Sequence, residues 1–153
     1  MEEKKLLKIT ISENILHSTC IFQHKAPLPP IKNALTACLK KFPNLNNKSL
    51  SILVTSDNEI EKLNSQYLNH HCATDVLSFP GNPAEESGYI GDIVISYETT
   101  VTQATEWKVT PEEELSRLTI HGILHLLGYT DYNEKDRKNM HQIQEEILLS
   151  LLL

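Results

Sequence analysis

The hydrophobic residues of this chain recur with two periods, one typical of helices and one typical of strands. Spacings of three and four residues predict helices over residues 31–42, 57–68, 97–106, 110–128 and 134–151. Alternating or β-branched runs predict strands over residues 6–11, 50–55, 75–79 and 89–96. Pro80 closes the third of these strands, which favours an edge position because proline cannot donate into a ladder. The pattern therefore predicts one domain over residues 1–153 with an α+β (mixed α/β) fold, a sheet of about four strands covered by helices.

The fourth predicted helix has clear end signals and is apolar nearly all round. Thr110 is a typical N-cap, Pro111 suits the first turn and Glu113 completes a capping box. From residue 118 to residue 127, every residue except Thr119 and two histidines is apolar or glycine. We therefore expect a buried helix, whose imidazoles need partners because an unpaired buried polar group costs about 1–3 kcal/mol.

His121 and His125 are four residues apart, so they lie one turn apart on one face of this helix. Gly128 tolerates the left-handed conformation that ends many helices, and a sharp turn there can return Asp131 to the same face. Two imidazoles and one carboxylate with an open fourth position are typical of catalytic zinc. The sequence thus predicts one Zn²⁺, or another divalent ion, bound by His121, His125 and Asp131. The alternative is a pair of core histidines with a structural role.

The residue after the first histidine limits the chemistry. In H-E-x-x-H peptidases it is a glutamate that acts as general base, and here it is Gly122. A zinc peptidase that works by that mechanism would lack its base.

Three blocks of residues stand out along the chain. They are Leu63-Asn64 and Tyr67 followed by residues 74–80, Thr-Asp-Val-Leu-Ser-Phe-Pro; Gly91-Asp92-Ile93; and His121-Gly-Ile-Leu-His125-Leu-Leu-Gly128-Tyr129. Together they resemble the YbeY family, metal-dependent endoribonucleases of bacterial rRNA maturation. The resemblance extends from about Ile52 to about Leu148. It implies a mixed, partly parallel sheet with the histidine helix at its centre.

The resemblance also implies a function and a set of site residues. It implies cleavage of single-stranded RNA in 16S rRNA 3′-end maturation and ribosome quality control, with the small ribosomal subunit as partner. We take His121 as catalytic residue as well as ligand. Thr74, Asp75 and Ser78 are candidates for lining the substrate groove, with strand-start capping as their alternative role. The mechanism we favour is metal-assisted phosphodiester cleavage, in which the ion polarises a phosphoryl oxygen, activates water, or both. Water and the ribose 2′-hydroxyl both stay open as the nucleophile.

Two residues depart from the family pattern. Asp131 stands where the family has its third histidine, and a carboxylate makes a bound metal less electrophilic than an imidazole does. Leu68 stands where the family has an arginine thought to act on the phosphate. Two other functions therefore stay open: a metallohydrolase of small substrates, and a catalytically weakened, ribosome-associated RNA-binding module.

Composition indicates the class of protein and its cellular compartment. The 40% hydrophobic and 22% charged content is ordinary for a globular protein, and the start Met-Glu-Glu-Lys-Lys is charged. Three widely spaced cysteines without a C-x-x-C pair favour reduced thiols, so we expect a cytoplasmic protein. The sequence has no stretch of eighteen apolar residues, so we expect no membrane partner. His70, His71 and Cys72 could form a second metal cluster, but we favour a loop in which these potential ligands are incidental.

The net charge of −6 argues against general nucleic-acid binding, and we expect no DNA partner. A local stripe of cations can still bind a phosphate backbone, and one candidate stripe is Arg117, Arg137 and Lys138. On the last helix, His141 and Glu145 face either the site or solvent, and solvent is the default expectation for both.

Overall fold

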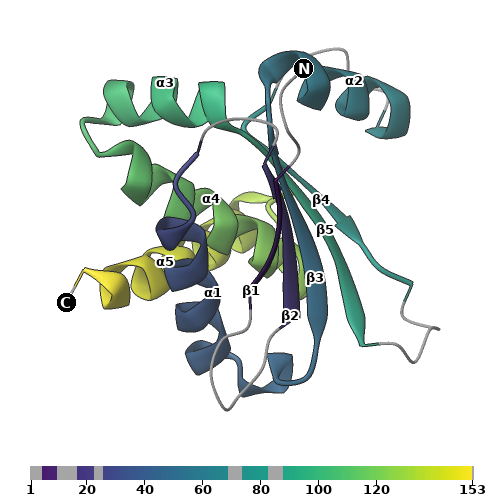
Figure 1. The fold of residues 1–153 in the computed structure, drawn as a ribbon. Helices are drawn as coiled ribbons and strands as arrows, with labels where there is room; N and C mark the ends of the chain where they lie inside the picture. The colour runs from purple at the N-terminus through teal and green to yellow at the C-terminus, as the bar shows by residue number, and fades with distance from the viewer. Residues whose placement is uncertain (1–4, 10–16, 23–25, 69–73, 83–87, 153) are drawn as a thin grey trace.

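The structure is a computed structural model that describes residues 5–9, 17–22, 26–68, 74–82 and 88–152, with side chains from residue 26 onward. Five strands and five α-helices follow one another in these ranges (Figure 1). The strands are β1 (Lys5–Ile9), β2 (His17–Phe22), β3 (Ser49–Thr55), β4 (Val76–Pro80) and β5 (Tyr89–Ser96). The helices are α1 (Pro29–Lys41), α2 (Asp57–Leu68), α3 (Tyr97–Trp107), α4 (Pro111–Leu126) and α5 (Glu134–Leu151), with a 3-10 turn at Pro43–Leu45.

The five strands form one mixed sheet in the order β1-β2-β3-β5-β4. The β2–β3 and β3–β5 pairs are parallel, and the outer pairs β1–β2 and β4–β5 are antiparallel. The mixed, partly parallel sheet and the edge position of β4 are confirmed.

The predicted number of strands, about four, was one too low. The missed strand is β2, which lies inside the sheet between β1 and β3. Its first three residues are His-Ser-Thr, and its apolar residues do not alternate with polar ones. The period-2 signal that marks a half-buried strand is therefore absent here, so periodicity alone does not reveal this one.

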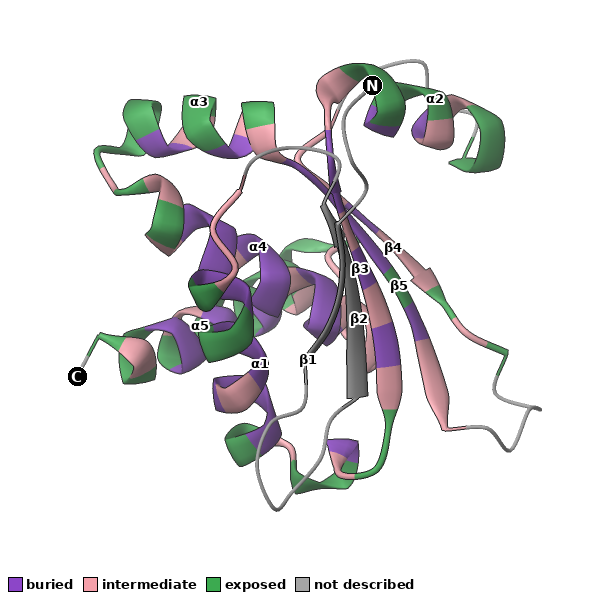
Figure 2. Cartoon of the chain, viewed as in Figure 1, coloured by how far each residue is buried: buried purple, intermediate pink, exposed green. Residues whose placement is uncertain are grey.

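Different helices pack against the two faces of the sheet. Leu50, Ile52 and Val54 of β3 and Ile93 and Ile95 of β5 face α1, α4 and α5, and together they form the main core. On the opposite face, Leu77 and Val94 of the sheet pack against Ile60 of α2 in a smaller cluster. Figure 2 shows α4 as the most continuously buried helix, between the sheet and the outer helices. The expected central position of the histidine helix is therefore confirmed.

Local sequence accounts for how α4 begins. The Thr110 hydroxyl accepts a hydrogen bond from the Glu113 amide at 3.1 Å, and Pro111 occupies the first turn. The Glu113 carboxylate does not complete the expected capping box. It lies 3.5 Å from the Arg117 guanidinium instead. Within the described ranges, no helix is both long and apolar enough to span a membrane.

Candidate metal centre

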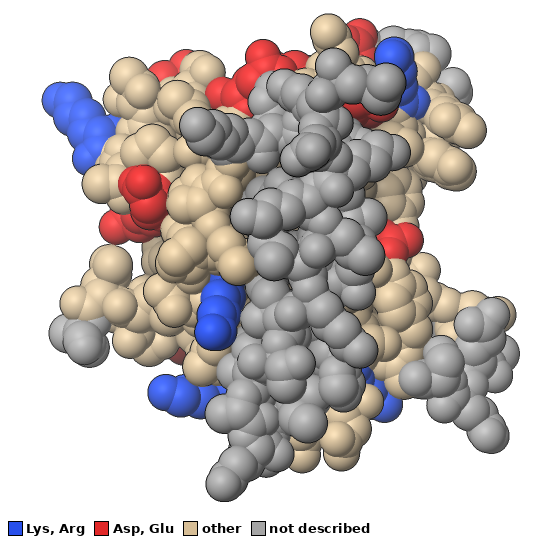
Figure 3. Space-filling view, viewed as in Figure 1, with Lys and Arg blue, Asp and Glu red and all other residues tan. Residues whose placement is uncertain are grey.

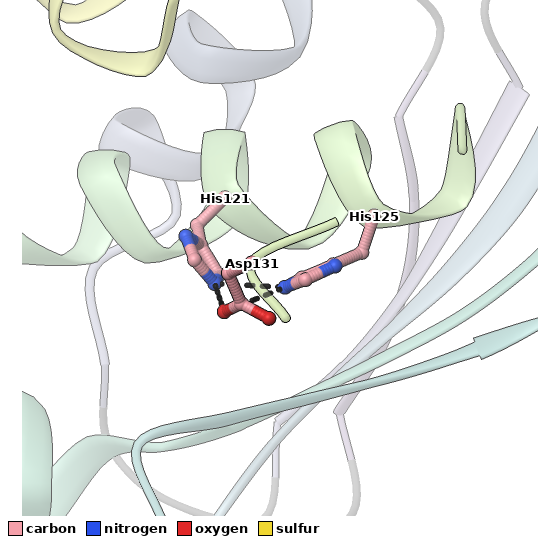
Figure 4. Close-up of side chains that lie close together, drawn as sticks. All are labelled: His121, His125 and Asp131. Carbon is pink, nitrogen blue, oxygen red and sulfur yellow. Dashed lines mark hydrogen bonds and ion pairs between the residues drawn. The ribbon is translucent and has the colours of Figure 1, made fainter. Parts of the chain in front are cut away.

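Three side chains from the end of α4 and the turn after it converge on one point (Figure 4). The Nε2 atoms of His121 and His125 are 3.0 Å apart. A carboxylate oxygen of Asp131 lies 3.6 Å from the His125 Nε2 and 4.0 Å from the His121 Nε2. In a tetrahedral site with bonds of about 2.0–2.1 Å, neighbouring ligand atoms lie about 3.3 Å apart. The triangle of ligand atoms is therefore close to the size that one such ion requires.

The turn that returns Asp131 is a Schellman motif. The Tyr129 amide donates to the Leu124 carbonyl and the Gly128 amide to the His125 carbonyl, both at 3.0 Å. Gly128 has a φ of +99°, which disfavours any residue with a Cβ. The predicted left-handed glycine and the predicted return of the carboxylate are both present.

Hydrogen bonds on the far side of each ring point both Nε2 lone pairs at this centre. The His121 Nδ1 lies 2.7 Å from the side-chain oxygen of Gln144, and the His125 Nδ1 lies 3.1 Å from the Tyr129 carbonyl oxygen. Both partners only accept, so both Nδ1 atoms carry protons and both Nε2 atoms are unprotonated in the neutral rings. Two lone pairs that face each other at 3.0 Å repel unless a cation lies between them. The donor set therefore fits a divalent ion.

Burial keeps His125 in the form that a metal needs. Burial and the neighbouring His121 lower the pKa of His125, and these effects outweigh Asp131 and the Tyr129 carbonyl, which raise it. At neutral pH the ring is uncharged, as a ligand must be.

Gly122 has a packing role that explains why no larger residue stands between the histidines. A Cβ at this position would lie 2.7 Å from a side-chain methyl carbon of Ile93 in β5. The helix thus rests directly on the sheet at the position where H-E-x-x-H peptidases carry their base.

A cavity of about 590 Å³ opens beside the ligands. Its wall includes His121 and Asp131, Asp75 immediately before β4, and several side chains from α5. The α5 residues in the wall are Arg137, Met140, His141, Gln144 and Glu145. Both orientations left open for His141 and Glu145 therefore apply in part: both residues contribute to this cavity, and His141 is also exposed to solvent.

Arg117 organises the charges at one end of the cavity. Its Nε donates to both carboxylate oxygens of Glu145 at 3.1 and 3.2 Å, and its Nη1 donates to Glu114 at 2.7 Å. Burial raises the pKa of Glu114 even though Arg117 acts in the opposite direction. The Arg117 side chain is thus fully engaged by carboxylates.

The predicted substrate-groove residues have local partners. The Asp75 carboxylate accepts from the Val76 amide at 2.8 Å and from Gln103 at 3.3 Å, and the Thr74 hydroxyl lies 3.3 Å from it. The Ser78 hydroxyl donates to the Gly122 carbonyl at 3.2 Å, so it ties β4 to α4. Asp75 alone of the three lines the cavity beside the ligands. Their role toward substrate stays a prediction.

Gln144 is a site residue that the sequence reasoning missed, and Arg137 entered that reasoning only as one member of a candidate stripe of cations. A signal for Gln144 existed, because it lies four residues after Met140 and three before Ile147, on the apolar face of α5. A buried amide on that face needs a partner, and His121 supplies it. His70, His71 and Cys72 lie outside the described residues, whereas Leu68 ends α2 and is 44% exposed.

Comparisons with known proteins agree with the residue pattern. A family model described as Endoribonuclease YbeY matches residues 17–152. The Endoribonuclease YbeY of Caldicellulosiruptor bescii is 37% identical over 133 residues, which cover 79% of this chain and 84% of that protein. The one of Aquifex aeolicus is 43% identical over 110 residues, covering 70% and 73%. The solution structure of TM1509 from Thermotoga maritima matches with a TM-score of 0.63 and 25% identity, covering 88% of each chain.

Proposed function

This chain belongs to the YbeY endoribonuclease family, and from that membership we propose that it is a metal-dependent endoribonuclease specific for single-stranded RNA. The observation that carries the proposal is the convergence of two imidazole lone pairs and the Asp131 carboxylate at the wall of an open cavity. Zn²⁺ suits this donor set, although another divalent ion can take the same ligands.

The chain's own residues prepare the site for a phosphodiester. Gln144 and the Tyr129 carbonyl hold the two rings so that neither has to reorient when the site is loaded. A divalent ion held there supplies a Lewis acid for the phosphoryl group and a source of nucleophile at neutral pH. The cavity beside the ligands leaves room for the scissile phosphate and its neighbours. In this proposal His121 acts both as ligand and as a wall of the reaction site, and Thr74, Asp75 and Ser78 contribute to the adjoining groove.

The charge distribution supports binding through a few local contacts. The net charge is −6, and on the face shown in Figure 3 lysine and arginine side chains stand singly and do not form a patch. We infer that binding of RNA depends on the metal centre and on cations close to it, because a net charge of −6 gives no general attraction for a phosphate backbone.

The family membership supports a biological setting that we include in the proposal. We assign the chain to 16S rRNA 3′-end maturation and ribosome quality control in the cytoplasm, with the small ribosomal subunit as its partner and no DNA substrate. Co-sedimentation of the purified protein with small subunits, compared with large subunits, tests the partner.

The activity is tested with a labelled unstructured RNA oligonucleotide, the same sequence as DNA, and an RNA duplex. We expect one equivalent of metal by elemental analysis and cleavage of the single-stranded RNA only. His125→Ala should lose both metal and cleavage while its circular dichroism spectrum stays that of the wild type. Metal binding without cleavage would instead support the RNA-binding module. Absence of metal together with a large loss of thermal stability in His125→Ala would support a structural role for the histidines.

A further inference from the structure

The cavity beside the metal ligands contains two arginines that differ in what holds them. Arg117 is surrounded by Glu113, Glu114 and Glu145, so its charge is already compensated. The Arg137 guanidinium makes no hydrogen bond or ion pair with any residue that the structure describes. An arginine that contributes to the cavity wall and has no carboxylate partner among the described residues can bind an anion from solvent.

Arg137 is held close to the ligands by the start of α5. The Asn133 side chain caps this helix by accepting from the Asp136 amide at 2.8 Å. The Thr130 hydroxyl donates to the Asp136 carboxylate at 3.2 Å, which ties the turn that carries Asp131 to the same helix end. Arg137 follows directly and shares the cavity wall with His121 and Asp131.

The acidic side chains of the cavity do not compete for Arg137. Both Glu114 and Glu145 are bonded to Arg117. The Asp75 carboxylate accepts from Val76 and Gln103. Asp131 lies with the two imidazoles.

We propose that Arg137 binds a backbone phosphate of the RNA strand beside the metal centre and so positions the strand for cleavage. A guanidinium presents parallel N–H donors that match two phosphate oxygens, and its charge does not depend on pH. This inference rests on the proposed function, because it names the residue that recognises the phosphate group of that substrate.

Lys138 provides a matched control on the next position of the same helix. It carries the same charge, but it pairs with Glu134 at 3.1 Å on the surface, where both side chains are more than three-quarters exposed. R137Q and K138Q therefore remove equal charge, and only the first removes it from the cavity.

The experiment measures binding of a fluorescein-labelled, unstructured RNA oligonucleotide to metal-free protein by anisotropy over a range of salt concentrations. A single phosphate contact contributes about 0.7 to the slope of log affinity against log salt for single strands. We expect R137Q to weaken binding about tenfold at low salt and to lower that slope by about 0.7, with K138Q close to wild type. R137K should keep the slope and lose part of the affinity, because lysine keeps the charge without the fork.

The outcomes separate this inference from the proposed function. Equal affinity and equal slope in R137Q and K138Q would overturn the role of Arg137, while cleavage by the metal-loaded wild type would leave the endoribonuclease intact. A wild type that neither binds nor cleaves the RNA would overturn both. A loss of bound metal in R137Q would also overturn the inference, since it would show that the residue acts on the ligands and not on the strand.

Discussion

Gly122→Ala tests whether the histidine helix is seated on the sheet as tightly as the structure indicates. Glycine inside a helix costs about 1 kcal/mol relative to alanine, so at an open position this substitution would stabilise the protein. Here the new Cβ would lie 2.7 Å from the Ile93 Cγ2 and 3.1 Å from its Cγ1 and Cδ1. Ile93 is fully buried, so it has little room to move. Overpacking a core costs about 1–3 kcal/mol, which leaves a net destabilisation of about 1 kcal/mol.

A double-mutant cycle tests whether the contact with Ile93 causes that loss of stability. In an Ile93→Ala background the added methyl enters vacated space, so Gly122→Ala should stabilise by up to about 1 kcal/mol. The free energy of unfolding of the four proteins is measured by urea denaturation followed by circular dichroism. Metal affinity is measured alongside, because Gly122 lies between the two histidine ligands. If Gly122→Ala stabilised the protein in the wild-type background, or changed the free energy of unfolding equally in both backgrounds, the close approach of residue 122 to Ile93 would be refuted.

Three other substitutions or reagents test the surroundings of the site. Gln144→Leu removes the hydrogen-bond acceptor of the His121 Nδ1 and should weaken metal binding about 10–100-fold, measured in competition with a chelating dye. The control Gln142→Leu changes an exposed residue of the same helix and should leave the affinity for metal unchanged. Equal affinities of the two variants would contradict the role of Gln144. Glu114 has a pKa raised above 4.5 by burial, so its contribution to stability is present below that pH and is lost as pH rises through its folded-state pKa. The unfolding free energy of wild type should therefore fall relative to Glu114→Gln as pH rises above 4.5, and a constant difference would show that the carboxyl is not perturbed. Burial raises the pKa of Cys38 to about 12, so peptide mapping after iodoacetamide treatment should find Cys38 modified only in denaturant.

Most of the fold followed from local rules. The apolar spacing of residues 111–126, the Thr110 cap and the Gly128 stop define α4 without reference to the rest of the chain. The same local logic returned Asp131 to the two histidines, because a Schellman turn fixes where the next residues go. Such features depend on residues within a few positions of each other, and sequence encodes them directly.

What sequence reasoning missed depends on contacts between distant elements. The Arg117–Glu145 pair joins α4 to α5 across 28 positions, and Gln144 reaches His121 across 23. No spacing rule identifies which acid a given arginine selects, since the answer depends on how two helices cross. The difference between Arg117, which pairs with carboxylates, and Arg137, which has no carboxylate partner among the described residues, also depends on how these helices pack. Only the folded structure shows it.

The proposals on the metal centre and on Arg137 concern one quantity, the positive charge that faces an RNA phosphate. Two neutral imidazoles and one carboxylate around a divalent ion leave a net charge of +1, whereas three neutral imidazoles would leave +2. Leu68 subtracts a further charge where the family resemblance implies an arginine. Arg137, without a carboxylate partner among the described residues, contributes one positive charge to the wall of the cavity beside the metal ligands. A chain with net charge −6 needs that charge close to the reaction centre, because its overall field repels the strand until a local contact forms. In the proposed site, residues of α4 and of the turn after it therefore serve catalysis, and Arg137 in the first turn of α5 attracts the substrate.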